Sequence, residues 1–109
     1  MIEIRQYTTA SGRNPFESWL ASLKDARAAA RIAARLDRLV AGNFGDAKPV
    51  GQGVSELRID YGPGYRIYFA MVSGTCVLLL SGGDKRRQSA DIAKAIDYLK
   101  DFKQRSSKP

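Results

Sequence analysis

The side chains best suited to chemistry in this sequence are basic, and they gather between residues 58 and 87. Arg58 and Arg66 lie in two segments whose apolar residues recur largely at every second position. This period predicts two strands that place both arginines on the polar face of a sheet. A third segment, residues 76–80, is continuously apolar and leads into GGDKRR at residues 82–87. The sequence therefore predicts an anion-binding surface made of a strand face and the cationic loop that follows.

The absence of histidine limits what this surface could catalyse. It excludes Ser-His-Asp and Cys-His arrangements, histidine-ligated metal sites and the two-histidine ribonuclease mechanism. Glu56, Asp60 and Asp84 are scattered beside basic neighbours, so a two-metal site is not predicted, and GGDK does not match a P-loop. Catalysis would therefore depend on Lys, Arg, Tyr and backbone groups.

Such groups suit the cleavage of RNA by its own 2′-hydroxyl. Guanidinium groups hold a phosphate bidentately and stabilise charge that develops on it. A lysine crowded by arginines has a lowered pKa and can then take or give a proton. Ordinary surface charge is the simpler account of each residue, and both accounts stay open at this point.

The overall charge favours a polyanionic partner. The 109 residues form one domain and include 18 basic and 11 acidic side chains, for a net charge of +7 and a pI of about 9.9. The excess lies in residues 24–41, 83–87 and 88–109. A small domain with this charge is typical of nucleic-acid binding, although charge alone does not separate binding from catalysis.

Cysteine content and hydropathy predict a cytoplasmic protein. The single cysteine, Cys76, lies in the most apolar segment and is expected to be a buried, inert thiol, which fits a reducing compartment. No apolar run approaches the roughly 20 residues that span a bilayer. The N-terminus, MIEIRQY, lacks the order of charges and apolar residues of a secretory signal.

Segments whose apolar residues recur at helical spacing lie before and after the three predicted central strands in the sequence. Asn14 to Glu17 predict a capped helix start with Pro15 at its first position, and an apolar stripe that includes Trp19 follows. This stripe is expected to pack in the core, with Trp19 as the one candidate for stacking. A second helix is predicted over residues 26–41, and residues 43–53 are predicted to be a loop. Ser89 is the predicted cap of the last helix.

The second helix carries basic residues along the face opposite its apolar one: Arg27, Arg31, Arg35 and Arg38. This stripe is either a solvated face or a docking surface for nucleic acid or an acidic partner protein. With a first strand near residues 2–7, the order β-α-α-β-β-β-α predicts an α+β fold, a small antiparallel-rich sheet packed against helices. Residues 1–104 form the domain, and residues 105–109 are expected to be a frayed tail.

Three segments carry a family resemblance: ELRIDYGPGYRIYF, LLLSGGDKRRQSADIAKAIDYLKDF and, in support, NPFESWL. With them the chain resembles the RelE/ParE toxin superfamily over residues 1–104, and within it the HigB-like killer proteins, also known as phage-derived Gp49-like proteins. The resemblance implies a toxin of a type II toxin–antitoxin module. Such toxins cleave mRNA, usually on the translating ribosome, without a metal or cofactor.

The resemblance also implies working residues and partners. Arg58, Arg66 and Lys85 match the catalytic pattern, and the RNA-binding residues would be Lys48, Arg86 and Arg87. Many relatives use a C-terminal Tyr or His, for which Tyr98 is the one weak match. An antitoxin encoded beside the toxin, commonly a HigA-like helix-turn-helix protein, is expected to bind the arginine stripe. Their complex would repress its own operator DNA.

Two alternatives to the nuclease remain at this stage. A ParE-like toxin shares the fold but inhibits DNA gyrase by binding it. A non-catalytic corepressor would use the same net charge only to bind nucleic acid. Arg58, Arg66 and Lys85 together favour the nuclease.

Overall fold

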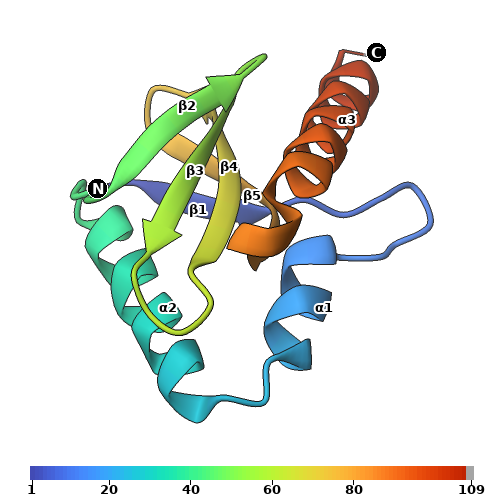
Figure 1. Cartoon of the computed structure of the whole chain (residues 1–109). Coiled ribbons are helices and arrows are strands. Elements are labelled where there is room, and N and C mark those ends of the chain that lie inside the picture. The colour runs from blue at the N-terminus through green and yellow to red at the C-terminus, as the bar shows by residue number, and fades with distance from the viewer. Residues whose placement is uncertain (108–109) are drawn as a thin grey trace.

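The computed structural model describes residues 1–107, so Lys108 and Pro109 of the predicted tail lie outside the described residues. It contains a five-stranded sheet with three α-helices (Figure 1). Along the chain the elements are β1 (Glu3–Gln6), α1 (Pro15–Ser22), α2 (Ala26–Val40), β2 (Ala47–Gly51), β3 (Val54–Ile59), β4 (Tyr65–Ser73), β5 (Cys76–Asp84), a 3-10 turn (Lys85–Arg87) and α3 (Gln88–Ser106).

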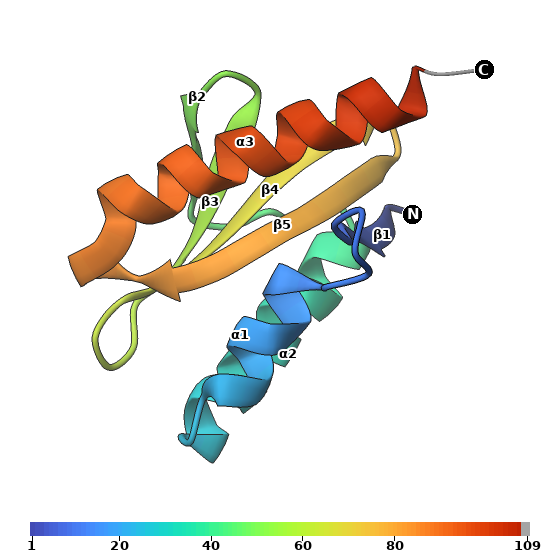
Figure 2. The ribbon, with the colours of Figure 1, turned by 90° about the vertical axis from the view of Figure 1, so that its right-hand side faces the viewer.

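The sheet has the order β1-β5-β4-β3-β2, in which β1 runs parallel to β5 and all other neighbours are antiparallel. Helices cover both faces: α3 lies across one face, and α1 and α2 lie on the other (Figure 2). Each face has its own apolar core, one including Phe16, Ile32 and Leu57, the other Val54, Ala95 and Leu99. The predicted α+β fold with helices packed on a mostly antiparallel sheet is confirmed.

The position of β5 in the sheet explains why its sequence is apolar without a break. It lies between β1 and β4, with Val77 and Leu79 in the core under α1 and α2 and Leu78 and Leu80 in the core under α3. A strand covered on both faces needs apolar residues at every position. The prediction for residues 76–80 is confirmed, and burial raises the pKa of the Cys76 thiol at the start of the strand.

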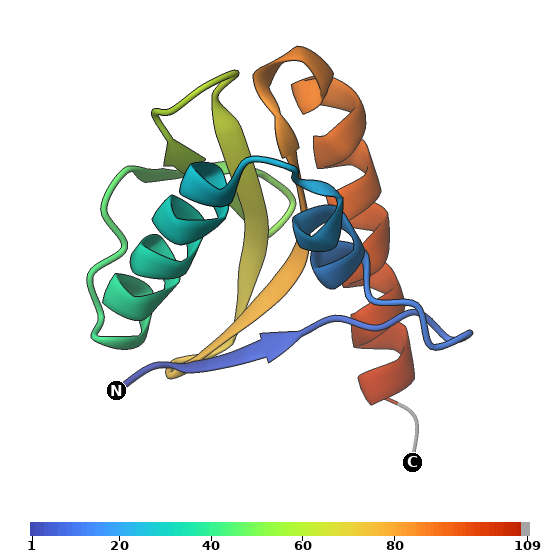
Figure 3. The ribbon, with the colours of Figure 1, turned by 90° about the horizontal axis from the view of Figure 1, so that it is seen from below.

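The predicted start of the first helix is also confirmed. Asn14 is the N-cap of α1, its side-chain oxygen accepts a hydrogen bond from the backbone N–H of Glu17 at 3.0 Å, and Pro15 is the first helical residue. Helix α2 ends at Val40, and Gly42 follows it with a φ of 92°. This positive φ is the conformation that glycine adopts readily after a helix. Figure 3 views the molecule from the side on which α1 and α2 lie, with both helices in front of the sheet.

The prediction of a loop over residues 43–53 is wrong in part, because β2 lies within it. This strand pairs antiparallel with β3, with Lys48 opposite Glu56. Pro49 argues against a strand from sequence alone, since proline cannot donate to a hydrogen-bond ladder. Strand β2 is however the edge of the sheet, where a missing N–H is tolerated.

The glycines at residues 82 and 83 do not form the predicted loop, because both belong to β5. A Cβ atom at Gly82 would overlap the ring of Trp19, and one at Gly83 would overlap the carboxyl group of Asp91. The glycines therefore let α1 and α3 approach the end of the strand closely, a reason that only packing reveals.

The last helix starts differently from the prediction as well. Helix α3 begins at Gln88, directly after the 3-10 turn, so Ser89 is not its cap. Asp84 caps the 3-10 turn instead, with its carboxylate accepting a hydrogen bond from the backbone N–H of Arg86 at 3.0 Å. The helix continues to Ser106, beyond the predicted domain end at residue 104. Within residues 1–107, no helix combines the length and apolarity needed to cross a bilayer.

Candidate active site

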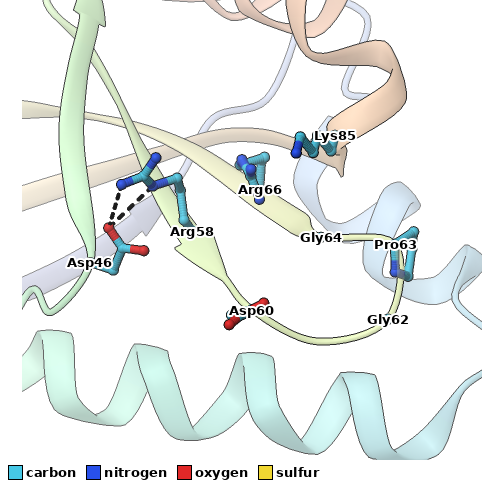
Figure 4. A pocket seen from close by; sticks show the side chains of 8 residues that line it. All are labelled: Asp46, Arg58, Asp60, Gly62, Pro63, Gly64, Arg66 and Lys85. Atoms are coloured by element: carbon cyan, nitrogen blue, oxygen red, sulfur yellow. Dashed lines mark hydrogen bonds and ion pairs between the residues drawn. The ribbon is translucent and has the colours of Figure 1, made fainter.

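A hollow of about 330 Å³ lies where β3 and β4 meet the end of β5 (Figure 4). Its lining contains the three predicted catalytic residues, each from a different element: Arg58 from β3, Arg66 from β4 and Lys85 from the 3-10 turn. The rest of the lining is Asp46, Asp60, Gly62, Pro63 and Gly64. The fold thus brings together three cations that are 27 residues apart at most in the sequence.

Strand register places the two arginines directly opposite each other. Arg58 of β3 pairs with Arg66 of β4, and Arg66 pairs in turn with Gly83 of β5. Residues opposed in this way share one face of the sheet, here the face that α3 covers. Like charges directly opposite each other are unfavourable on their own. Each arginine accordingly has a carboxylate beside it, and the two carboxylates differ in exposure.

Arg58 is held by an exposed partner. Its Nε and Nη2 atoms donate hydrogen bonds to the same carboxylate oxygen of Asp46, at 3.1 and 2.9 Å. The two side chains are 37% and 55% exposed. An ion pair this accessible stabilises the fold by only about 0–1 kcal/mol. A bound anion can therefore compete with Asp46 for the Arg58 guanidinium.

Arg66 is held from inside the protein. Its side chain is only 11% exposed, and its Nε atom lies 3.8 Å from the carboxylate of Glu56, which is fully buried. Glu56 also accepts hydrogen bonds from the side-chain amide of Gln88, the first residue of α3, at 3.0 and 2.8 Å. Glu56 thus links the arginine to the start of the last helix.

The opposite end of Arg66 faces the loop that closes the hollow. Gly64 has a φ of 81°, and a Cβ atom there would lie 3.4 Å from Arg66 Nη1 and 3.5 Å from the Cβ atom of Lys85. Arg66 Nη1 also donates to the backbone carbonyl of Tyr65 at 3.2 Å. Glycine at this position gives the loop its left-handed backbone and leaves space beside both cations.

A second row of polar residues lies next to the arginines on the same face of the sheet, two residues away along β3 and β4. Lys48, Glu56, Tyr68 and Ser81 face each other across β2, β3, β4 and β5. The Tyr68 hydroxyl and the Ser81 hydroxyl are buried and have no hydrogen-bond partner within residues 1–107. Burial raises the pKa of Tyr68. The Tyr68 hydroxyl is therefore buried under α3 and does not reach the hollow as a proton donor.

The three predicted RNA-binding residues are not part of the hollow. Lys48 is exposed on β2 in the second row, and Arg86 is exposed and paired with Asp84 at 3.4 Å. Arg87 lines a separate hollow beside α1. Tyr98 lies ten residues along α3 from Gln88, about 15 Å at 1.5 Å per residue, and its hydroxyl accepts a hydrogen bond from Arg13. Tyr98 is thus remote from the cations.

The arginine stripe of α2 is open except at one position. Arg27, Arg31 and Arg38 are exposed, and the guanidinium of Arg31 lies 4.5 Å from the ring centre of Tyr61. Arg35 instead donates hydrogen bonds to the backbone carbonyls of Arg58, Phe44 and Asp46. Burial lowers the pKa of Arg35.

Arg35 therefore holds the segment that carries Asp46 against β3. Arg35 is therefore half-buried and less free than the other three arginines of the stripe, because the segment after α2 folds back over it. Helical spacing alone cannot show this contact.

Four residues that shape the site were not predicted to belong to it: Asp46, Glu56, Asp60 and Gln88. Glu56, Arg58 and Asp60 are spaced by two, which in a strand places them on one side. That spacing was available as a signal. The contacts of Asp46 and Gln88 depend on how β2 and α3 pack, which no local pattern encodes.

The fold and the site define a small basic α+β domain with a cationic hollow at its strand ends. The chain matches the family described as "Phage derived protein Gp49-like (DUF891)" over residues 18–106. It therefore belongs to the Gp49-like family, a family of HigB/RelE-like toxins, and the predicted family resemblance is confirmed. Membership suggests a toxin of a toxin–antitoxin module and implies an antitoxin partner.

A relative supports the family assignment. A protein of Haemophilus influenzae (strain ATCC 51907 / DSM 11121 / KW20 / Rd) is 55% identical over 80 residues, which cover 73% of this chain and 81% of that protein. Its name, "Uncharacterized protein", states no activity.

Proposed function

We propose that this protein is the toxin of a type II toxin–antitoxin module and acts in the cytoplasm as an endoribonuclease on mRNA. Cleavage of mRNA on the ribosome would inhibit translation. The observation that carries the proposal is the meeting of Arg58, Arg66 and Lys85 around one open hollow. Its volume, about 330 Å³, falls in the range of sites for small ligands, and its three cations suit a phosphodiester.

In the proposed reaction the 2′-oxygen of a ribose attacks the neighbouring phosphorus, and the bond from phosphorus to the 5′-oxygen breaks. Arg66 binds the scissile phosphate, since Glu56 holds its Nε side from within. Arg58 turns from Asp46 to the phosphate and neutralises charge that grows on the non-bridging oxygens. The products are a 2′,3′-cyclic phosphate and a 5′-hydroxyl.

Two protons must move in this reaction. Asp60 and Lys85 line the hollow, and neither side chain has a hydrogen bond or ion pair with another residue of the described chain. Asp60 is suited to accept the proton of the 2′-hydroxyl, and Lys85 to donate one to the departing 5′-oxygen. This assignment gives the general base to a carboxylate of the β3–β4 loop.

The chemical ends of the RNA products test the mechanism. Purified protein incubated with mRNA, in the presence and absence of ribosomes, is expected to leave 5′-hydroxyl ends and 2′,3′-cyclic or 3′-phosphate ends. The proposed groups are guanidinium, ammonium and carboxylate, so cleavage is expected to survive EDTA. Asp60→Asn is expected to slow it about 100-fold or more without changing the ends.

Other outcomes would contradict the nuclease in distinct ways. Products with 5′-phosphate ends, or activity lost with the chelator, would exclude this mechanism. Toxicity with intact RNA and blocked gyrase supercoiling would replace it with the ParE-like alternative.

The antitoxin is proposed to contact the open part of the arginine stripe with an acidic segment, and through this complex to repress its operator. Reversal of Arg31 and Arg38 to Glu is expected to slow association with the protein encoded beside this gene, because complementary charge accelerates encounter. Association rates measured at low and high salt check this. Lys100→Glu, an equal charge change per site on exposed α3, is the control. An unchanged association rate would remove α2 from the interface.

A further inference from the structure

A second hollow, also of about 330 Å³, lies beside the first at the end of β5. Helix α1 and α3 form its two sides, and the glycines of β5 lie between them. Its lining consists of Trp19, Ser22, Leu23, Tyr65, Gly82, Gly83, Asp84, Arg87 and Asp91. The proposed reaction assigns no role to this hollow.

Its aromatic wall is held in place by close packing. The ring of Trp19 lies against the backbone of Gly82, where no Cβ atom would fit. It also makes an edge-on contact with Tyr65, with ring centres 6.1 Å apart and an interplanar angle of 66°. Trp19 remains partly exposed. A fixed, partly exposed indole is a surface on which a planar ring can pack.

The opposite wall contains two oppositely charged side chains near each other, Arg87 and Asp91. Arg87 and Asp91 make no hydrogen bond or ion pair with other side chains within residues 1–107. Burial raises the pKa of Asp91, while the charge of Arg87 nearby opposes this rise. A partly buried carboxyl group without a hydrogen-bond donor is unfavourable unless a ligand supplies one.

We propose that this hollow is a guanine-binding site and that it reads a base next to the cleaved phosphate. The carboxylate of Asp91 can accept both N1–H and N2–H of guanine, and the guanidinium of Arg87 can donate to O6 and N7. Adenine, cytosine and uracil each lack this combination of two adjacent donors and two adjacent acceptors. The recognition of a base beside the cleaved phosphate rests on the proposed function. The binding of guanine in this hollow does not depend on it.

The two hollows are placed to share one RNA strand. Tyr65 lines the second hollow and its neighbour Arg66 the first, because consecutive strand residues point to opposite faces. The 3-10 turn likewise carries Lys85 at one hollow and Arg87 at the other. A nucleotide bound at the end of the sheet can therefore place its phosphate between the arginines and its neighbour's base beside Trp19.

Trp19 is the single tryptophan of the chain, so its fluorescence reports on this hollow directly. Titration with GMP, AMP, CMP and UMP is expected to give saturable changes, with GMP bound about 10- to 100-fold more tightly than the others. Asp91→Asn is expected to remove this preference. Asp97→Asn, on the exposed side of the same helix, is the matched control and should retain it. Equal responses to all four nucleotides would overturn the proposal.

Mapping of RNA ends separates the two possible sources of the guanine. With RNA as the source, the parent protein leaves guanine enriched at one fixed position beside the cut, and Asp91→Asn loses this enrichment while still cleaving. GMP binding with unbiased cleavage would overturn the base reading and leave a site for free guanine nucleotides. GMP binding with intact RNA would contradict the nuclease but not the guanine site. Cleavage without any GMP preference would contradict the guanine site alone.

Discussion

Replacement of Arg66 by alanine is expected to slow RNA cleavage about 100- to 1000-fold, the effect of removing one donor that stabilises developing charge. Arg66 is the less exposed of the two arginines in the hollow, its Nε atom lies 3.8 Å from the buried carboxylate of Glu56, and Gly64 leaves room at its other end. Arg66→Lys is expected to recover little activity, because a single ammonium cannot reproduce the planar fork of a guanidinium. Single-turnover cleavage of labelled RNA in the presence of EDTA measures both.

Arg86→Ala is the matched control for this experiment. Arg86 is a neighbouring arginine with an 84% exposed side chain that does not line the hollow. Its loss is expected to change cleavage little, apart from a general weakening of RNA binding. Equal losses in the Arg66 and Arg86 variants would mean that positive charge, and not the geometry of the hollow, drives the reaction.

The same substitution of Arg66 is expected to lower the free energy of unfolding by about 3–5 kcal/mol. A polar-face position alone predicts that the fold tolerates alanine there. Glu56 changes this expectation, because its carboxylate is fully buried and would lose the arginine with which it is ion-paired. Only the amide of Gln88 would remain as its side-chain partner among the described residues. Urea unfolding followed by circular dichroism measures the change.

A second substitution distinguishes two causes of this loss of stability, a buried charge without its partner and the loss of side-chain packing. Glu56→Gln in the Arg66→Ala protein removes the buried charge at almost constant shape and is expected to recover a large part of the lost stability. Arg58→Ala serves as the comparison, since its exposed pair with Asp46 contributes at most about 1 kcal/mol. If Arg66→Ala were as stable as the parent protein, Glu56 would not depend on Arg66.

The stability measurement also shows whether a slower cleavage rate reflects the loss of the arginine or the unfolding of the variant. Cleavage rates of the Arg66 variants are to be compared at a temperature where circular dichroism shows each to be folded. The Glu56→Gln, Arg66→Ala protein provides a folded molecule without the arginine. Its cleavage rate should remain as low as that of Arg66→Ala if Arg66 acts on the phosphate.

Local patterns in the sequence determined most of the elements. The period of two between Glu56 and Arg58 identified β3, the unbroken apolar run of residues 76–80 identified a strand covered on both faces, and Asn14 with Pro15 marked the start of α1. These signals are reliable because each depends on neighbours a few residues away. The same period put Arg58 and Arg66 on one face, and the family resemblance added Lys85.

Tertiary structure alone decided which groups meet at the site. Strand register set Arg58 opposite Arg66 and Glu56 opposite Tyr68, and the pairing of β2 brought Asp46 to Arg58. The segment after α2 folds back so that Arg35 donates hydrogen bonds to the backbone carbonyls of Phe44 and Asp46, and Arg35 is less free than its neighbours in the stripe.

Packing at the end of β5 likewise turned the glycines of a predicted loop into contacts for Trp19 and Asp91. All of these contacts join residues that are distant in the chain. Their geometry follows from how whole elements pack to bury apolar surface, and the spacing of residues along one element carries no information about that packing.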